Sequence, residues 1–275
     1  MAQIKMKMNL NLLRRSIADK RLSLLVYALG IAAYAVLILA IWPSLRGNAD
    51  LLNQLWKSYP ESIRKAFGGE NMTFSTFDGF LSVEFFNQMW MIIMIAFTIS
   101  IATGAIAAEI ENGTMELLLA QPISRRAVLV TRYFFFEAGI LFLIGAAMMP
   151  IAIGAPLAGG DLRYSGLLAL VLPSFLFFTA VGSITFFFST LFNNRGRAIF
   201  VSLGIIIFCY ALDILAKIND TVGHVHFLSI FYYWDPYRYL HGPNWAWGDI
   251  MVLVGITLAS TAAAVIWFER RDIAV

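Results

Sequence analysis

Six apolar segments, each long enough to cross a lipid bilayer, constrain this chain more than any other feature of its sequence. The hydrocarbon core of a bilayer is about 30 Å thick, and a helix crosses it in roughly 20 residues. Inside that core every backbone polar group needs a partner within the segment, so an unbroken apolar run is expected to be helical. We therefore predict six membrane-spanning helices, at residues 22–42, 89–108, 127–153, 167–192, 198–216 and 250–268.

The composition supports a polytopic membrane protein. Hydrophobic residues make up 60% of the 275 residues and charged residues only 13%, about half the charged fraction of a soluble domain. We expect an all-α membrane protein in which residues 1–275 form a single transmembrane domain. The net charge of +3 comes from 20 basic and 17 acidic residues, a balance that argues against nucleic acid as a partner.

The N-terminal segment, residues 1–21, is basic and amphipathic. Met6, Leu10, Leu13 and Ile17 recur at spacings of three and four, the pattern of a helix with one apolar face. We predict an interfacial helix that lies on the bilayer before the first span, with its cations facing lipid phosphates. The alternative is a disordered basic start.

Two long connections separate the spans, at residues 43–88 and 217–249. A broken apolar stripe in the first, interrupted by Pro60, predicts two short helices on the outer surface. Five phenylalanines then lead into the second span and predict an aromatic anchor at the membrane interface. They are Phe74, Phe77, Phe80, Phe85 and Phe86.

The basic residues indicate the orientation of the chain. Six spans place both termini on one side of the membrane. That side holds 13 of the 20 Lys and Arg, in the termini, in residues 109–126 with Arg132, and in the turn 193–197. The other 7 are spread over much longer connections. Because Lys and Arg concentrate in short cytoplasmic loops, both termini and residues 109–126 are predicted to be cytoplasmic.

The segment 109–126, between the second and third spans, reads EIENGTMELLLAQPISRR. Gly113 permits a sharp turn, residues 114–120 favour a helix, and Pro122 disfavours helix at the residue before it. The leucines of this short helix can fill an apolar groove on a cytoplasmic partner while its glutamates meet polar groups. The alternative, leucines that dip into lipid, is opposed by the glutamates because the inner leaflet is negatively charged.

The run E-I-E-N-G-T-M-E-L-L-L-A-Q-P-I-S-R closely resembles a motif of type-2 ABC transporter permeases. The resemblance extends to the basic N-terminal helix, the six spans and a long outer connection, where residues 232–236 (YYWDP) resemble a looser pattern. It implies that the segment is a coupling helix seated in a cleft of a separate nucleotide-binding subunit. The residues to which this role is assigned are Glu109, Glu111, Gly113, Thr114, Glu116, Leu117, Leu118 and Pro122.

The resemblance also implies an assembly of two permease subunits with two ATPase subunits in the plasma (inner) membrane of a prokaryote. The chain itself lacks the G-x-x-x-x-G-K-[ST] phosphate loop, so it is not the ATPase. We expect ATP and Mg to bind to the partner, and no cofactor or metal to bind to this chain. The expected function is ATP-driven export of a hydrophobic or amphipathic cargo, such as a drug, a peptide antibiotic or a lipid.

Two other functions remain open. The same docking helix would serve a membrane assembly or sensor subunit that transports nothing. An intramembrane enzyme would need a cluster of reactive side chains within the spans, and these offer only Glu137 and Asp213, near opposite faces of the membrane.

Two groups of polar residues have competing interpretations. Arg132 and Glu137 in the third span are either a gate or coupling pair, or a structural intramembrane pair, because ionisable groups at membrane depth usually face protein or water. His224, His226, His241 and Asp235 include the donor types of an external metal site. Their aromatic surroundings favour an interfacial belt instead.

Overall fold

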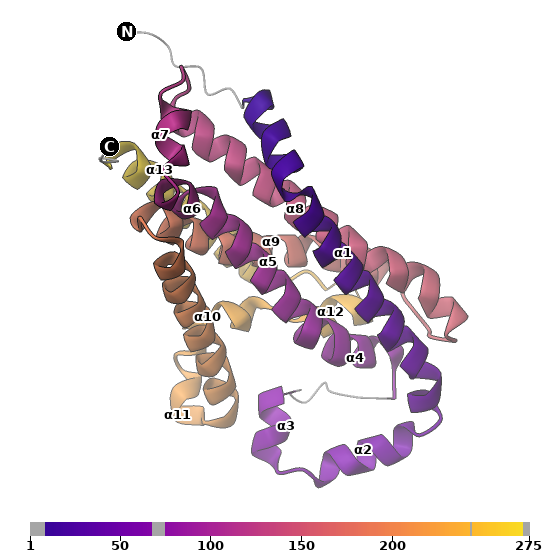
Figure 1. The fold of residues 1–275 in the computed structure, drawn as a ribbon. Helices are drawn as coiled ribbons and strands as arrows, with labels where there is room; N and C mark the ends of the chain where they lie inside the picture. Colours follow the sequence, from indigo (N-terminus) through magenta and orange to yellow (C-terminus); the bar gives the residue numbers. More distant parts are fainter. Residues whose placement is uncertain (1–8, 68–74, 243, 272–275) are drawn as a thin grey trace.

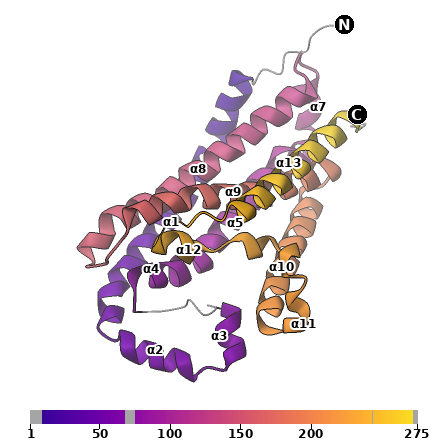
Figure 2. The same ribbon diagram turned by 180° about the vertical axis from the view of Figure 1, so that it is seen from behind.

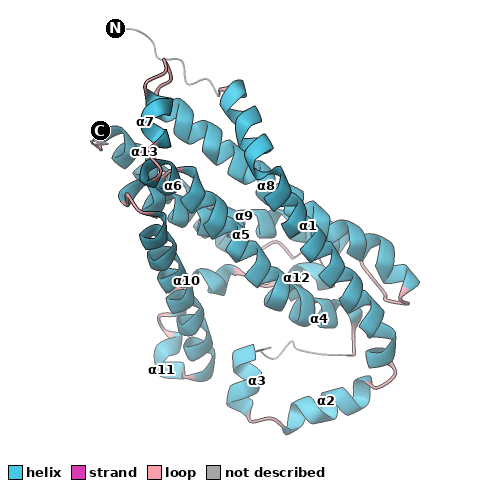
Figure 3. Ribbon diagram, in the orientation of Figure 1, coloured by secondary structure: helices cyan, strands magenta, loops and turns pink. Residues whose placement is uncertain are grey.

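The computed structural model describes residues 9–67, 75–242 and 244–271, and these residues form helices and loops without any strand. Six helices in this part of the chain are long and apolar enough to cross a membrane (Figures 1 and 3). They are α1 (Leu10–Arg46), the continuous run Phe77–Ala105, α8 (Arg125–Leu157), α9 (Tyr164–Leu191), α10 (Arg195–Ile218) and α13 (Trp247–Arg270).

Helix α9 lies at the centre of the bundle. It packs against α8, α10, α13 and the second span, and it is the most deeply buried of the six. Figure 2 shows α13 running across α9 on the face opposite α1. Helices α13 and α10 are the least buried, and their outward faces carry large apolar side chains such as Phe200, Phe208 and Trp267. These faces are therefore available to lipid or to another subunit.

The first span differs from its prediction. Helix α1 runs without a break from Leu10 to Arg46, so the predicted division between an interfacial helix (1–21) and a span (22–42) is wrong for the described residues. No Gly or Pro occurs among residues 10–21, and most of them are good helix formers. Leu12 and Ser16 are buried, so this end of α1 packs on the rest of the protein. Residues 1–8 lie outside the described part.

The second span begins twelve residues earlier than predicted. Its helix starts with α4 (Phe77–Phe80), continues through the π-helix η1 (Leu81–Met89) and ends with α5 (Trp90–Ala105). The predicted interfacial anchor is therefore wrong for the phenylalanines at 77, 80, 85 and 86, which are buried in the core, and Phe74 lies outside the described residues. At Gln88 the backbone is not helical, with φ −116° and ψ −110°, and this kink separates the two halves of the span.

The connections contain short helices. In the first, α2 (Ala49–Ser58) and α3 (Glu61–Phe67) flank Pro60, which confirms the two predicted helices. The second contains α11 (Asp220–Gly223), two 3₁₀ turns (His226–Leu228 and Ile230–Tyr233) and α12 (Pro236–His241).

The two ends of the bundle differ in what they carry. At one end lie the start of α1, the end of α13 and the short helices α6 (Ala107–Glu111) and α7 (Thr114–Leu119) (Figure 1). At the other end lie α2, α3 and α11. The segment between the second and third spans therefore shares an end of the molecule with both termini of the described chain.

Candidate partner-docking site

The segment between the second and third spans forms two short helices joined by a tight turn. Gly113 makes that turn with φ +68°, in the left-handed region that glycine enters without strain. Helix α7 then runs from Thr114 to Leu119, one residue shorter than predicted, and Pro122 follows it. Ser124 accepts a hydrogen bond from the Ala127 N–H at 3.2 Å and so caps α8, as expected from the sequence.

Glu109 and Arg132 together join four helices at this end of the bundle. Glu109 Oε1 accepts a hydrogen bond from Arg132 Nη2 of α8 at 2.7 Å, and its Oε2 accepts one from Thr114 Oγ1 of α7 at 2.5 Å. Arg132, only 8% exposed, also donates from Nη1 to Ser16 Oγ of α1 at 3.2 Å. A buried guanidinium is stable only when it is paired, so this contact fixes α6 and α7 against α1 and α8.

The structure does not bring Arg132 and Glu137 together. Five residues along a helix correspond to a rotation of roughly 140°, so the two side chains face different neighbours. Glu137 Oε2 accepts a hydrogen bond from Thr179 Oγ1 of α9 at 2.6 Å. The charge partner of Arg132 is Glu109, which the sequence placed in the docking segment and not in the membrane.

Glu111 joins the same segment to the turn between α9 and α10. Its carboxylate accepts hydrogen bonds from Asn194 Nδ2 at 2.6 Å and from the backbone N–H of Arg195 at 2.8 Å. Arg195 is the first residue of α10, where a negative charge is favoured by the helix dipole. Two of the predicted docking glutamates therefore hold the segment on its own subunit.

A break in the second span directs the segment across the bundle. At Ile106 the backbone leaves the helix, with φ −126° and ψ −60°. Ser189 Oγ, from α9, occupies the gap: it accepts a hydrogen bond from the Ala107 N–H at 3.0 Å and donates one to the Thr103 carbonyl at 3.3 Å. In an unbroken helix the Ala107 N–H would donate a hydrogen bond to the Thr103 carbonyl, so this hydroxyl replaces one backbone hydrogen bond of the helix.

Replacement of Ser189 by alanine is expected to lower the free energy of unfolding by about 1–3 kcal/mol, because the buried Ala107 N–H and Thr103 carbonyl lose their partner. The measurement is denaturant unfolding of the purified chain in mixed micelles. Ser174→Ala is the matched control: Ser174 is buried on the same helix, but its hydroxyl donates only to the Leu170 carbonyl one turn earlier. Equal losses for both variants would contradict the role given to Ser189.

The outward face of the segment is apolar at its centre. Leu117 is 72% exposed, whereas Met115 and Leu118 are buried beneath α7. Glu116 is partly exposed and Pro122 is exposed. We call Glu116, Leu117 and Pro122 the exposed ridge. The eight predicted docking residues thus divide into this ridge, the turn residue Gly113, and four residues that hold the segment in place: Glu109, Glu111, Thr114 and Leu118.

Residues far away in the sequence complete this end of the molecule. Arg125 donates to the Phe268 carbonyl at 3.3 Å and to the Arg271 carbonyl, and Arg271 donates to the carbonyls of Thr190 and Phe192. These contacts bind the end of α13 to α8 and α9. In the sequence, the clustered arginines predicted only which side of the membrane this end faces. Nothing in their spacing identified the carbonyls to which they donate, and nothing identified Ser189 as a partner of the second span.

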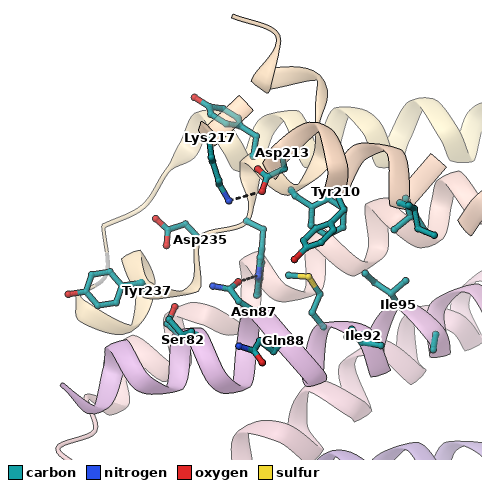
Figure 4. A pocket seen from close by; sticks show the side chains of 18 of the residues that line it. Ser82, Asn87, Gln88, Ile92, Ile95, Tyr210, Asp213, Lys217, Asp235 and Tyr237 are labelled. Carbon is teal, nitrogen blue, oxygen red and sulfur yellow. Dashed lines mark hydrogen bonds and ion pairs between the residues drawn. The ribbon is translucent and has the colours of Figure 1, made fainter. Parts of the chain in front are cut away.

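The opposite half of the bundle contains a cavity of about 820 Å³ between the second span and α10 (Figure 4). Its polar end is lined by side chains of α10 and of the connection between α10 and α13. Asp213 Oδ2 accepts a hydrogen bond from Lys217 Nζ at 2.6 Å, and Asp213 Oδ1 lies 2.7 Å from His226 Nε2. Trp234 Nε1 donates to Asn87 Oδ1 at 2.9 Å, next to the kink at Gln88.

The histidines considered as metal ligands are engaged separately. His226 contacts Asp213, whereas the ring of His241 stacks on Tyr237. Within residues 9–67, 75–242 and 244–271, no three His, Cys, Asp or Glu side chains come close enough together to hold a metal ion.

Comparison with known proteins identifies the family of the chain. A search of curated proteins finds no match. A scan of protein families matches residues 13–273 to the ABC-2 family transporter proteins. The match includes the first candidate span from residue 13 onward, the other five spans in full, and both short helices α6 and α7. We conclude that the chain belongs to the ABC-2 family, whose members are transmembrane permease subunits without catalytic activity.

Proposed function

We propose that this chain is the membrane-spanning subunit of an ATP-driven exporter that moves a hydrophobic or amphipathic cargo. The observation that carries the proposal is Leu117, an exposed leucine on a short helix that is otherwise fixed to its own subunit. A large apolar side chain held outward on a rigid element is typical of a helix that inserts into a groove of a partner protein. The partner in this proposal is an ABC ATPase subunit, which binds ATP and Mg.

The position of the exposed ridge supports a cytoplasmic partner. Helix α7 lies at the end of the bundle that carries both termini of the described chain, and 11 of the 18 Lys and Arg in the described residues belong to this end. Because Lys and Arg concentrate on the cytoplasmic side, we assign this end to the cytoplasm of a prokaryotic cell.

The coupling route follows from the contacts of the segment. Force applied to α7 reaches α8 and α1 through Glu109 and Arg132, and reaches α10 through Glu111 and Asn194. Helix α10 forms one wall of the cavity, and the second span, which continues into α6, forms the other. Movement of the segment therefore acts on both walls. This favours transport over an assembly or sensor role, which needs no cavity.

A second permease subunit, identical or homologous, is expected to cover exposed apolar faces of the bundle. The least buried spans are α10 and α13, and Phe200 and Phe208 project outward from α10. An assembly of two permease and two ATPase subunits would leave two docking helices, one for each ATPase.

The proposal is tested by replacing Leu117 with aspartate in the chain co-expressed with its ATPase subunit. An aspartate inserted into an apolar groove is unpaired, so we expect affinity for the ATPase to fall at least about tenfold and cargo-stimulated ATP hydrolysis to be lost. The measurements are co-purification, and ATPase activity and transport in proteoliposomes.

Leu51→Asp is the matched control, because Leu51 is a similarly exposed leucine on α2 at the other end of the bundle. It is expected to leave both the affinity and the ATPase rate unchanged. If Leu117→Asp retains a full complex and full coupled transport, the exposed ridge is not the docking surface.

A further inference from the structure

The cavity between the second span and α10 is amphipathic along its length. Its apolar walls face each other across the cavity, with Ile92, Ile95 and Ile99 on one side and Leu203, Ile206 and Ile207 on the other. Their spacing of three and four places each set on one face of its helix. Between Met91 and Ile99 the apolar wall extends over roughly 12 Å, the length of a medium alkyl chain.

Polar groups occupy only the outer end of this cavity. Figure 4 shows Ser82, Asn87 and Gln88 near the start of the second span, across the cavity from Tyr210 and Asp213 of α10. A molecule that fills such a cavity places its apolar part along the walls and its polar head at the outer end. The cavity therefore fits an amphiphile better than a uniformly apolar compound.

Two carboxylates and one ammonium group line this end, and they are not equivalent. The Asp213 side chain is only 4% exposed and is closed off by Lys217 and His226. Asp235 is exposed; its Oδ1 accepts the backbone N–H of Arg238 at 3.2 Å as the cap of α12. Its other oxygen has no partner in the part of the chain that the structure describes. Because Lys217 is neutralised by Asp213, Asp235 supplies the unbalanced charge.

Aromatic rings at the same end of the cavity also favour a cationic head. Tyr210 and Tyr232 line the same end and are both substantially exposed, and Tyr237 lies on the Asp235 side of the cavity (Figure 4). The face of an aromatic ring attracts a cation within about 6 Å of its centroid. An exposed carboxylate with one oxygen unpartnered among the described residues, in the same cavity lining as Tyr210, Tyr232 and Tyr237, favours a positively charged head over a negative or neutral one.

We propose that this cavity binds an amphiphile with a cationic head and an apolar tail, and that Asp235 is the residue that selects the charge of the head. This assignment rests on the proposed exporter function and specifies its cargo class. The cation lies against Asp235 and the tyrosines, and the alkyl part lies between the second span and α10. An anionic head at the same position would face the unbalanced carboxylate of Asp235.

The test compares three 12-carbon amphiphiles: dodecyltrimethylammonium, dodecyl sulfate and dodecyl maltoside. Saturation binding of each radiolabelled compound is measured on the full chain in lipid nanodiscs, with binding to empty nanodiscs subtracted. We expect the cationic compound to bind at least about tenfold more tightly than the other two. Asp235→Asn is expected to remove this preference and to leave dodecyl maltoside binding unchanged. Asn caps a helix as well as Asp does, so α12 is retained.

Two further variants make each outcome decisive. Asp161→Asn replaces an exposed carboxylate in the turn between α8 and α9, outside the cavity, and should change nothing. Ile207→Trp fills the cavity from a partly exposed position and should weaken all three compounds.

Suppose that Ile207→Trp weakens the binding of all three compounds, but that the unsubstituted chain binds them equally and Asp235→Asn has no effect. The cavity is then the binding site, the selection of a cationic head by Asp235 is wrong, and the exporter proposal stands. If Ile207→Trp has no effect, the cavity is not the binding site and the inference fails. The exporter proposal is judged separately, by the Leu117 variant in the complex with the ATPase.

Discussion

Replacing Gly182 by alanine is expected to destabilise the bundle by about 2–3 kcal/mol, the upper range for an overpacked core. A Cβ atom at position 182 would lie 1.9 Å from Cζ of Phe136 and within 2.9 Å of two further ring atoms. Phe136 is fully buried between α8 and α9 and packs against Tyr133 and Phe186, so its ring has no free direction in which to move. The two helices must therefore separate, and unfolding in mixed micelles should occur at lower denaturant.

Two variants test this explanation. Gly204→Ala on α10 adds the same methyl group where no atom lies within 4 Å, and the higher helix propensity of alanine should make it neutral or stabilising by up to about 1 kcal/mol. Gly182→Ala combined with Phe136→Leu makes room for the methyl group and should recover part of the loss. A Gly182→Ala variant as stable as Gly204→Ala would show that the contact between α8 and α9 is not tightly packed.

Features encoded by local residue chemistry were predictable from the sequence. The apolar runs identified the six long helices, since a single apolar segment of about 20 residues can pair its backbone polar groups within itself only as a helix. The turn at Gly113, the helix that follows it and the cap at Ser124 were likewise predictable, because each depends on residues within one or two turns.

Features that depend on tertiary contacts were missed. Asp78 and Glu84 lower the hydropathy of residues 77–88, so the start of the second span resembled a loop. Within the bundle that stretch is covered by other helices: Tyr34 of α1 donates to the Glu84 carbonyl at 2.6 Å and stacks on Phe85.

The internal anchors of the candidate site show the same limit. The motif predicted a role for Glu109 and Glu111 in docking, but their partners in the structure, Arg132 and Asn194, lie 23 and 83 residues away. Only the contacts of Glu109 with α8 and of Glu111 with the α9–α10 turn reveal that these glutamates hold the segment. The exposed ridge, and not the whole motif, is therefore the surface on which the docking proposal depends.

Replacing Arg132 by methionine is expected to destabilise the folded chain by about 3 kcal/mol, because removing one partner of a buried ion pair leaves the other without compensation. Methionine preserves much of the apolar stem and removes only the guanidinium. Glu109 would keep its hydrogen bond from Thr114 but lose its bond to α8, and Ser16 of α1 would lose a donor. Because the same contact positions α7, cargo-stimulated ATP hydrolysis by the complex should fall with stability.

A double-mutant cycle separates the ion pair from general packing. Adding Glu109→Gln to Arg132→Met removes the unpaired charge and should recover a large part of the stability, whereas Glu109→Gln alone should be clearly destabilising. The matched control is Arg126→Met, which breaks the pair with Glu269 at the same end of the molecule. Those side chains are 57% and 27% exposed, so less than about 1 kcal/mol is expected. If Arg132→Met is no worse than Arg126→Met, or if Glu109→Gln rescues nothing, the ion pair does not anchor the segment 109–126, and contacts such as Glu111 with Asn194 must carry that role.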